Sequence, residues 1–311
     1  MVKSVYPNGF SNGVTIRGAN VVNNYAGTVY WVDSNAGSDQ NKGTERRPFA
    51  TIDKAIGTCS ANNGDIIMLK PGHAEDISDA TTFQVDTAGT SIIGIGNGAA
   101  RPTFTFTGTG GRVEVDSAST SIENVRFLAS VSAVVVGMNV DADNCRFIEC
   151  EWDYDATGDD FLIFVDVQDV AGTEFYGCTF KAEEGTAGSN EAIRMDNADE
   201  TKIVGCDFFG DFANAAIWSD TSGDTGDGST ISNQILISRN TIHQDDTANG
   251  TCIDLNNADT GVIEYNSLTT TGSTGVAAAL DPGSCACVEN YATSQVDKSA
   301  SLVPATTDTI S

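Results

Sequence analysis

The sequence predicts an all-β fold, a right-handed parallel β-helix (solenoid) with a short N-terminal capping helix. Two observations lead to this fold class. A short apolar pattern recurs at about the spacing of one solenoid coil, and the segments between its copies are rich in Asp, Asn, Ser, Thr and Gly, which favour tight turns. The chain has 311 residues, of which 40% are hydrophobic, so one continuous core can be filled.

Seven segments share the apolar pattern, and each is described here by one reference residue. The reference residues are Val125, Cys145, Cys178, Cys206, Asn240, Asn266 and Asn290, and they follow one another at 20 to 34 residues. Three positions earlier lie Ile122, Ala142, Phe175, Ile203, Ile237, Ile263 and Cys287, with Ala142 the weakest member. Two positions later lie Phe127, Phe147, Phe180, Phe208, Ile242, Leu268 and Ala292. We expect like residues to form buried ladders along the rod.

A second set of turns precedes the first in each coil, after a short apolar strand. These turns contain Asp166, Asp196 and Asp220 among other Asp and Asn residues, whose side chains bond the backbone two residues further on. One coil cannot bury its own apolar face. Stacking coils about 4.8 Å apart pairs every strand with the next coil, and the parallel crossovers are expected to be right-handed.

The repeat divides the chain into four regions: an N-terminal arm (1–27), an N-terminal cap with the first strand (28–72), the parallel β-helix (73–292), and a C-terminal tail or cap (293–311). In the cap, Phe49, Ile52, Ala55 and Ile56 fall on one helical face. We expect this helix to cover the open end of the stack, because an uncovered sheet edge promotes aggregation.

The chain is strongly acidic, with 43 acidic and 16 basic residues and a net charge of −27. A nucleic-acid partner is excluded because no basic footprint exists to neutralise phosphates, and an anionic membrane would repel the surface for the same reason. No segment is apolar enough to span a membrane, and the first residues lack the apolar region of a secretory signal. We interpret the negative charge mainly as a means of keeping the protein soluble; the alternative is that it binds multivalent cations.

Without a secretory signal, the eight cysteines are expected to be made in a reducing cytoplasm. Their spacing matches no common zinc site, so no structural metal is expected from them. Cys145, Cys178 and Cys206 share one position of the repeat, so we interpret them as a buried ladder of small apolar residues.

A lyase site on this fold would need acidic calcium ligands and a basic residue on neighbouring coils. Arg194 and Asp196 fall on one face of a strand, so Arg194, Asp196 and Asp166 are the candidate catalytic residues, and Asp166, Asp196 and Asp220 the candidate calcium ligands. The alternative is a ladder of Asp turns beside a surface arginine, and we favour it because turn Asp is common for structural reasons. No cofactor is expected, and calcium is the one ion that these three aspartates suggest.

The opening of the chain resembles pectin-lyase-like right-handed β-helix proteins. The resemblance is carried by the loop Gly37-Ser38-Asp39-Gln40-Asn41-Lys42-Gly43-Thr44 and by Pro48-Phe49-Ala50-Thr51-Ile52. More narrowly, Tyr6-Pro7-Asn8-Gly9-Phe10 and Lys70-Pro71-Gly72-His73 resemble β-helix proteins of tailed phages and prophages. Such proteins are virion components: tailspikes, fibres or capsid decorations, commonly trimers.

The resemblance implies a non-enzymatic virion structural protein, a capsid decoration or head fibre. It would be assembled in the host cytoplasm as a homotrimer and held on capsid or tail proteins through residues 1–27. The alternative is a tailspike, or a polysaccharide lyase or hydrolase acting on an acidic or surface glycan. A calcium-stabilised adhesin is a third hypothesis.

Overall fold

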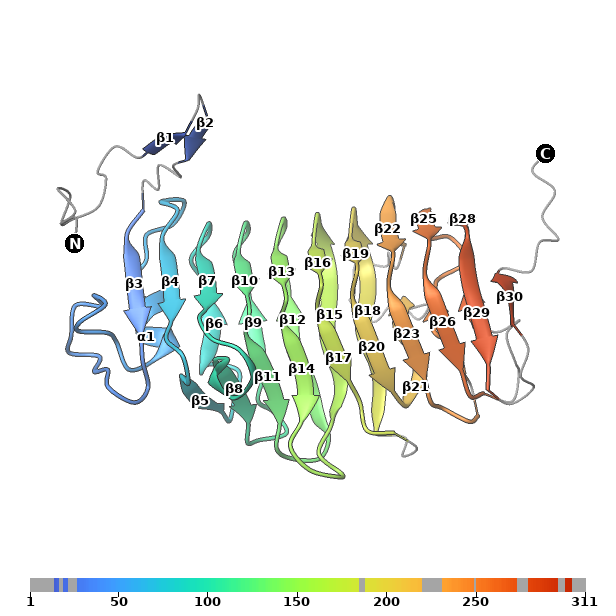
Figure 1. The fold of residues 1–311 in the computed structure, drawn as a ribbon, viewed down its shortest axis with the longest axis horizontal. Helices are drawn as coiled ribbons and strands as arrows, with labels where there is room; N and C mark the ends of the chain where they lie inside the picture. Colours follow the sequence, from blue (N-terminus) through green and yellow to red (C-terminus); the bar gives the residue numbers. More distant parts are fainter. Residues whose placement is uncertain are drawn as a thin grey trace.

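The computed structural model describes residues 27–184, 188–219, 231–248, 250–272, 279–295 and 300–303, with the backbone of β1 (Val14–Ile16) and β2 (Ala19–Val21). The chain forms a rod of stacked parallel coils, with its first coil at one end and its last at the other (Figure 1). This confirms the all-β parallel solenoid. The right hand of the coil remains a prediction.

Each coil contributes one strand to each of up to three sheets that run along the rod. The first sheet contains β3 (Val29–Val32), β4 (Ile66–Leu69), β7 (Ser91–Gly94), β10 (Ser121–Glu123), β13 (Arg146–Ile148), β16 (Glu174–Tyr176), β19 (Lys202–Val204), β22 (Ile235–Ser238), β25 (Gly261–Glu264) and β28 (Ala286–Val288).

The second sheet contains β5 (Ala74–Ile77), β8 (Thr103–Phe106), β11 (Arg126–Ala129), β14 (Glu151–Tyr154), β17 (Thr179–Lys181), β20 (Asp207–Gly210), β23 (Thr241–Gln244), β26 (Ser267–Thr270), β29 (Asn290–Ser294) and β30 (Ala300–Val303). The third sheet contains β6 (Phe83–Val85), β9 (Val113–Val115), β12 (Val134–Val140), β15 (Phe161–Ala171), β18 (Ser189–Asp199), β21 (Phe212–Ser219), β24 (Ile253–Asp254) and β27 (Leu280–Asp281). Within the described residues, no helix is long and apolar enough to cross a membrane.

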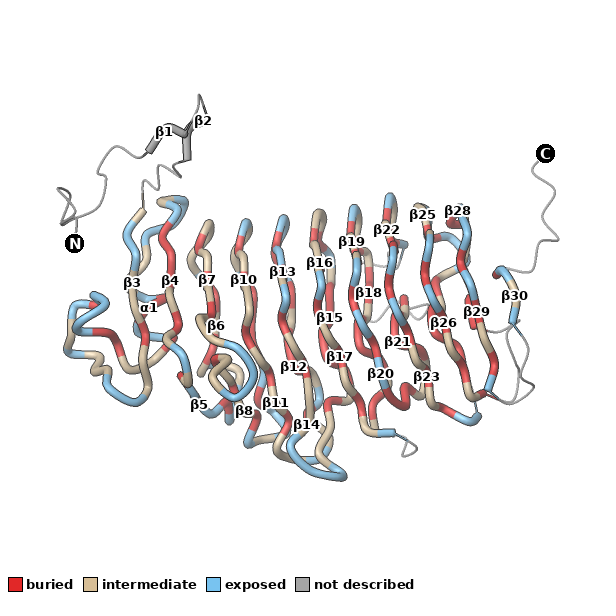
Figure 2. The backbone as a smooth tube through the Cα atoms, in the orientation of Figure 1, coloured by how far each residue is buried: buried red, intermediate tan, exposed pale blue. Residues whose placement is uncertain are grey.

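Strand pairing aligns the inward residues into columns, and nearly all of these residues are buried. Buried stretches recur from coil to coil along the backbone (Figure 2). On the first sheet the column is Ile67, Ile92, Ile122, Phe147, Phe175, Ile203, Ile237, Ile263 and Cys287. On the second sheet it is Phe104, Phe127, Trp152, Phe180, Phe208, Ile242, Leu268 and Ala292. The core is therefore continuous along the rod, as the repeat predicts.

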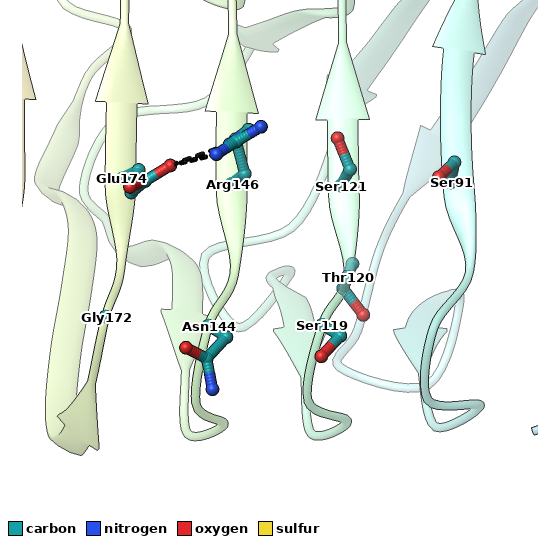
Figure 3. A pocket seen from close by; sticks show the side chains of 8 residues that line it. All are labelled: Ser91, Ser119, Thr120, Ser121, Asn144, Arg146, Gly172 and Glu174. Carbon is teal, nitrogen blue, oxygen red and sulfur yellow. Dashed lines mark hydrogen bonds and ion pairs between the residues drawn. The ribbon is translucent and has the colours of Figure 1, made fainter. Parts of the chain in front are cut away.

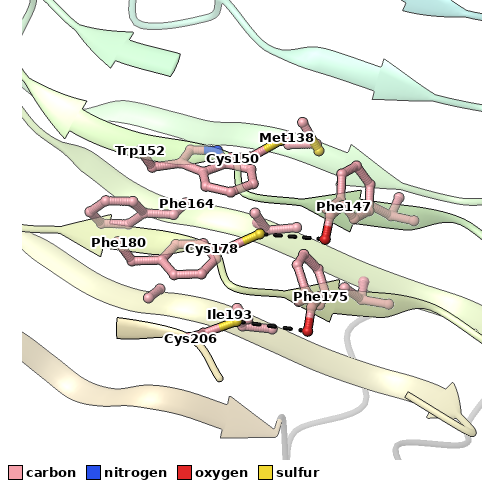
Figure 4. Close-up of a cluster of buried hydrophobic side chains, with 14 of the residues drawn as sticks. Met138, Phe147, Cys150, Trp152, Phe164, Phe175, Cys178, Phe180, Ile193 and Cys206 are labelled. Carbon is pink, nitrogen blue, oxygen red and sulfur yellow. Dashed lines mark hydrogen bonds between the residues drawn. The ribbon is translucent and has the colours of Figure 1, made fainter. Parts of the chain in front are cut away.

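The aromatic residues of the second-sheet column stack face to face. The ring centroids of Trp152 and Phe180 are 4.7 Å apart, and those of Phe180 and Phe208 are 4.8 Å apart with the planes 4° from parallel. Figure 4 shows Trp152 over Phe180, beside a second aromatic pair, Phe147 and Phe175. The rings match the spacing between paired strands, so each coil adds one ring without leaving a gap.

Two predicted ladder positions are wrong. Phe147 pairs with Ile122 and Phe175 on the first sheet, not with Phe127 and Phe180. Cys145 lies before β13, and Cys150 holds the reference position beside Cys178, because Trp152 pairs with Phe180. The local sequence contains a cysteine followed two positions later by an aromatic residue twice, at 145–147 and 150–152. The pattern alone did not separate them, and the weak fit of Ala142 was the sign of the error.

The side chain at the corrected reference position has the same role in each of these coils: it bonds a backbone carbonyl oxygen of the first sheet. The thiols of Cys150, Cys178 and Cys206 each lie 3.5–3.7 Å from the carbonyl oxygen of a first-sheet residue. In later coils the amide of Asn240, Asn266 or Asn290 donates to the equivalent carbonyl at 2.8–3.0 Å. Cysteine and asparagine are therefore alternative donors to the same backbone group.

The turn before each reference residue contains one residue with left-handed backbone geometry. The residues are Asn124, Glu149, Gly177, Gly205, Arg239, Tyr265 and Glu289, with φ between 49° and 65°. Non-glycine residues adopt this region at a cost of about 1 kcal/mol or more. The bend between the first two sheets is thus the same in each coil, and coil-to-coil hydrogen bonds hold it in place.

At the N-terminal end, α1 (Ile52–Ile56) is a five-residue helix with Ile52, Ala55 and Ile56 buried; η1 (Gly98–Ala100) is a 3-10 turn further on. The side chain of Thr51 caps α1, and Glu75 Oε1 accepts from Ile52 N at 2.7 Å. His73 is 1% exposed; its Nδ1 accepts from Ser34 N, and its Nε2 lies 2.7 Å from Glu75 Oε1. These contacts fix α1 to the first coils, while its role as a cap stays a prediction.

Residues 1–26 of the predicted arm lie outside the described residues, apart from the backbone of β1 and β2, which pair antiparallel. At the other end, β30 pairs antiparallel with β29 and so covers the last edge of the second sheet. The rest of the predicted C-terminal tail lies outside the described residues.

Candidate functional site

The outer face of the third sheet has a polar row along most of the rod. The row consists of Gln84, Glu114, Asn139, Asp166, Arg194, Trp218, Asp254 and Asp281, each paired in register with the next. Each side chain lies between two inward residues of its strand, as Asp166 lies between the buried Val165 and Val167. The strand alternation therefore directs the whole row outward.

The centre of the row is an ion pair between Asp166 and Arg194. Arg194 Nε donates to Asp166 Oδ1 at 2.8 Å, and a second guanidinium nitrogen bonds Asp166 Oδ2. Gln168 Nε2 donates to the same Oδ2 at 2.7 Å. The side chains of Asp166 and Arg194 are only 2% and 18% exposed, so this pair is well shielded from water, unlike most surface ion pairs.

The pair limits the chemistry open to Arg194. A guanidinium stays protonated in proteins, so Arg194 is a fixed cation and not a proton acceptor. The bidentate contact with Asp166 uses two of its donors and neutralises its charge. To act on an acidic sugar, Arg194 would have to leave a buried carboxylate without its cation, which is strongly unfavourable.

A group of three carboxylates lies one to two coils earlier on the same face. Ligand atoms of Glu114, Asp116 and Asp141 all lie within 4.8 Å of one another. Burial raises the pKa of Asp141 to about 6, helped by the negative charges of Glu114, Asp116 and Asp166. Oxygen donors at this separation suit a calcium ion.

Neighbouring side chains also bond these carboxylates. Gln84 Nε2 donates to Asp116 at 2.6 Å, Asn139 Nδ2 donates to Asp141 at 2.8 Å, and Arg112 contacts Glu114. These contacts offset part of the repulsion within the group. The group can therefore hold together as a hydrogen-bonded surface cluster, and cation binding is a further capability of its geometry.

The structure brings two of the sequence candidates into direct contact. Asp166 and Arg194 are in contact, and Arg194 and Asp196 share the outward face of β18. Asp196 is 1% exposed and pairs in register with Gln168. Asp220 lies outside the described residues.

Sequence reasoning missed Glu114, Asp116 and Asp141. Their signal is alternation: Val113-Glu114-Val115-Asp116 and Met138-Asn139-Val140-Asp141 each place apolar and polar residues on opposite faces. Only the register of β9 against β12 shows that the two polar faces coincide.

A polar hollow of about 370 Å³ lies on the outer face of the first sheet. It is lined by Ser91, Ser119, Thr120, Ser121, Asn144, Arg146, Gly172 and Glu174 (Figure 3). Ser91 and Ser121 are small and leave the depression beside Arg146, whose Nε donates to Glu174 at 2.7 Å.

No family model and no curated protein matches the chain. Similar solved structures include a rhamnogalacturonan lyase, at 14% identity and a TM-score of 0.47, over 86% of this chain and 74% of that one. Pectate lyase Pel9A matches at 13% identity and a TM-score of 0.41, over 86% and 77%. ORF18 of Geobacillus virus E2 matches at 12% and 0.43, over 86% and 61%. These likenesses are to parallel β-helix proteins and do not bear on activity.

Proposed function

We propose that this chain is a non-enzymatic structural protein of a phage particle, a capsid decoration or head fibre displayed as a right-handed β-helical rod. It would assemble in the host cytoplasm as a homotrimer, be held on capsid or tail proteins through residues 1–27, and have α1 as the cap of its first coil. The right hand follows from the strong preference of parallel crossovers. The opening motifs that resemble phage β-helix proteins support a role in a phage particle.

The observation that carries the non-enzymatic part is the closed ion pair between Asp166 and Arg194. Arg194 is the one basic candidate of the predicted lyase site, and its guanidinium bonds a carboxylate that is 2% exposed. This geometry fits a structural pair that joins β15 to β18. It does not fit a side chain that must meet a substrate.

A stability cycle tests the structural role of the pair. Arg194→Met leaves Asp166 with a buried charge and should lower the free energy of unfolding by about 3–5 kcal/mol. The double variant Asp166→Leu/Arg194→Met removes both charges and should recover most of that loss. Equal destabilisation in the single and double variants would show that the ion pair is not what holds the two strands.

The assignment to a particle has its own test. Antibodies against the purified protein should label phage particles made by cells that carry the gene, and the protein should be found by mass spectrometry in purified particles. The protein should leave acidic and neutral polysaccharides intact. Depolymerisation that is lost in Arg194→Met but kept in the exposed control Arg239→Met would overturn the proposal.

A second candidate function is a calcium-dependent tailspike, lyase or hydrolase that binds an acidic or surface glycan. The observation that favours it is the carboxylate group Glu114, Asp116 and Asp141 beside the Asp166–Arg194 pair. If the group holds calcium, millimolar calcium should raise the melting temperature of the wild-type protein and not that of Glu114→Gln/Asp141→Asn. Equal shifts in both proteins would reject the site, as would the lack of any shift.

A further inference from the structure

The outer face of the first sheet differs from the other two faces of the rod. It has two rows of outward side chains that run across all ten strands, and twelve of these twenty positions are apolar. We call these twelve residues the apolar face: Val29, Ile66, Leu236, Val262 and Ala286 in one row, and Trp31, Met68, Ile93, Ile148, Tyr176, Val204 and Val288 in the other.

Eleven of these twelve side chains are at least partly exposed, and Ile66 is buried at 6% exposure. Val29 and Val288, at the two ends of the face, are 41% and 39% exposed, and between them Met68, Tyr176 and Val204 are half-buried. The outward rows of the second sheet hold mostly Thr, Ser and charged residues, with isolated apolar residues such as Leu128 and Phe209. Apolar side chains thus occur on nine of the ten strands of this face and are interrupted at β10, where both outward residues, Ser121 and Glu123, are polar; an apolar patch of this extent marks an interaction surface.

Charge distinguishes this face from the outer face of the third sheet. Its outward positions hold two cations, Arg146 and Lys202, and three anions, Glu123, Glu174 and Glu264, a net charge of −1. Both cations bond Glu174 at 2.7 Å. On the third sheet, the polar row alone holds four carboxylates and one arginine. The whole chain has a net charge of −27.

We infer that copies of this chain associate side by side through the apolar face. Two copies of so acidic a chain repel each other over most of their surfaces, and this repulsion is weakest where the face is nearly neutral. A second copy also matches the face in length, because its own strip has the same ten-strand span and the same spacing. A parallel copy can place its Arg146 and Lys202 near Glu123 and Glu174 of the first.

The size of the face suits such an interface. Ten strands at about 4.8 Å give a strip about 43 Å long, and two rows of side chains make it roughly 15 Å wide. The strip thus covers about 650 Å² per copy, or about 1,300 Å² for a pair, at the lower end of the range of specific interfaces. The hollow beside Arg146 lies within the strip and leaves room for a side chain of the second copy.

This inference rests on the proposed assembly into oligomers and names the surface that would form them. The wild-type protein should show three times 32.5 kDa, the mass of the proposed homotrimer, by light scattering and sedimentation at micromolar concentration. The variant Ile148→Glu/Val204→Glu adds two charges to the strip and should weaken association at least about a hundredfold. The control Leu128→Glu/Phe209→Glu makes the same changes at outward positions of the second sheet and should keep the wild-type mass.

The outcomes separate the two proposals. A wild-type monomer at all concentrations would reject both the proposed assembly and the interface. An oligomer that survives Ile148→Glu/Val204→Glu, or that the control dissociates equally, would reject the interface alone. Should a variant fail to fold, hydroxyl-radical footprinting of the wild type decides: Met68 and Tyr176 should become more reactive on dilution while Phe209 does not, and equal reactivity at all concentrations would reject the interface.

Discussion

The buried asparagine ladder allows a quantitative test of how the coils are joined. Asn266 is 1% exposed, and its side chain makes four hydrogen bonds: Nδ2 donates to Ile237 O at 3.0 Å and to Asn290 Oδ1 at 2.9 Å, and Oδ1 accepts from Asn240 N at 2.9 Å and from Asn240 Nδ2 at 3.0 Å. The substitution Asn266→Leu keeps the size and removes all four. It leaves the buried N–H and one amide hydrogen of Asn240 without a partner.

The expected loss follows from those orphaned groups. Each buried polar group that loses its partner costs about 1–3 kcal/mol, and the extra apolar burial of leucine recovers roughly 1–2 kcal/mol. With two such groups at about 2 kcal/mol each, we expect Asn266→Leu to lower the free energy of unfolding by about 2–3 kcal/mol. Urea unfolding followed by circular dichroism measures this change, and hydrogen exchange should show the largest loss of protection in β23 and β26.

The matched control is Asn139→Leu, on the outer face of β12. Asn139 makes one exposed hydrogen bond, to Asp141, so its replacement should cost less than about 1 kcal/mol. If both variants lose the same stability, or if Asn266→Leu is neutral, the ladder does not contribute as the hydrogen bonds indicate. Asn266→Cys should be milder than Asn266→Leu, because a thiol can still donate to the carbonyl of Ile237.

Three other predictions concern the core, the thiols and pH. Phe180→Ala should lower the free energy of unfolding by about 3–5 kcal/mol, and Phe209→Ala, 39% exposed on the same sheet, by less than about 1 kcal/mol. Burial raises the pKa of the Cys252 thiol to about 12 and that of Cys287 to about 11, so alkylation of the native protein at pH 8, read by peptide mass, should be slow at both until urea is added. Burial, with the charges of Asp246 and Asp245, raises the pKa of Asp211 to about 6, above its unfolded value. As the pH rises from about 4 to about 6, the free energy of unfolding of the wild type should therefore fall relative to that of Asp211→Asn, and below about pH 4 the two values should converge in urea titrations.

Inward residues were predictable from the sequence because similar residue types recur at the same position of each repeat. Ile122, Phe175, Ile203, Ile237 and Ile263 stand at one position of the pattern, and the structure stacks them in one column. The Asn240, Asn266 and Asn290 ladder was predictable for the same reason, because asparagine recurs at one position of the pattern in three successive coils. The error at Phe147 arose where two overlapping segments fit the pattern equally well.

Outward residues were not predictable in the same way, because their meaning depends on register. Glu114 and Asp141 are 27 positions apart and show no shared motif, yet pairing of β9 with β12 brings their carboxylates together. Val204 and Ile148 alternate with buried residues and look like ordinary parts of apolar strands. Strand alternation alone leaves two choices for which apolar residues face solvent. The choice is settled only once the position of the turn between the first and second sheets is also known.

The same register explains why the polar row of the third sheet is not uniformly acidic. Side chains in neighbouring coils are about 4.8 Å apart, where two carboxylates repel by roughly 3 kcal/mol at an effective dielectric constant of 20. The row avoids this by interleaving: Asn139 lies between Glu114 and Asp166, and Arg194 follows Asp166. In the described part of the row, Asp254 and Asp281 are adjacent acids, and burial and the charge of Asp281 raise the pKa of Asp254. The acids of this row are therefore separated by a neutral or basic residue in the next coil except at Asp254 and Asp281, and the pKa of Asp254 is raised where they are not, which ties the charge pattern of the sequence to the spacing of the coils.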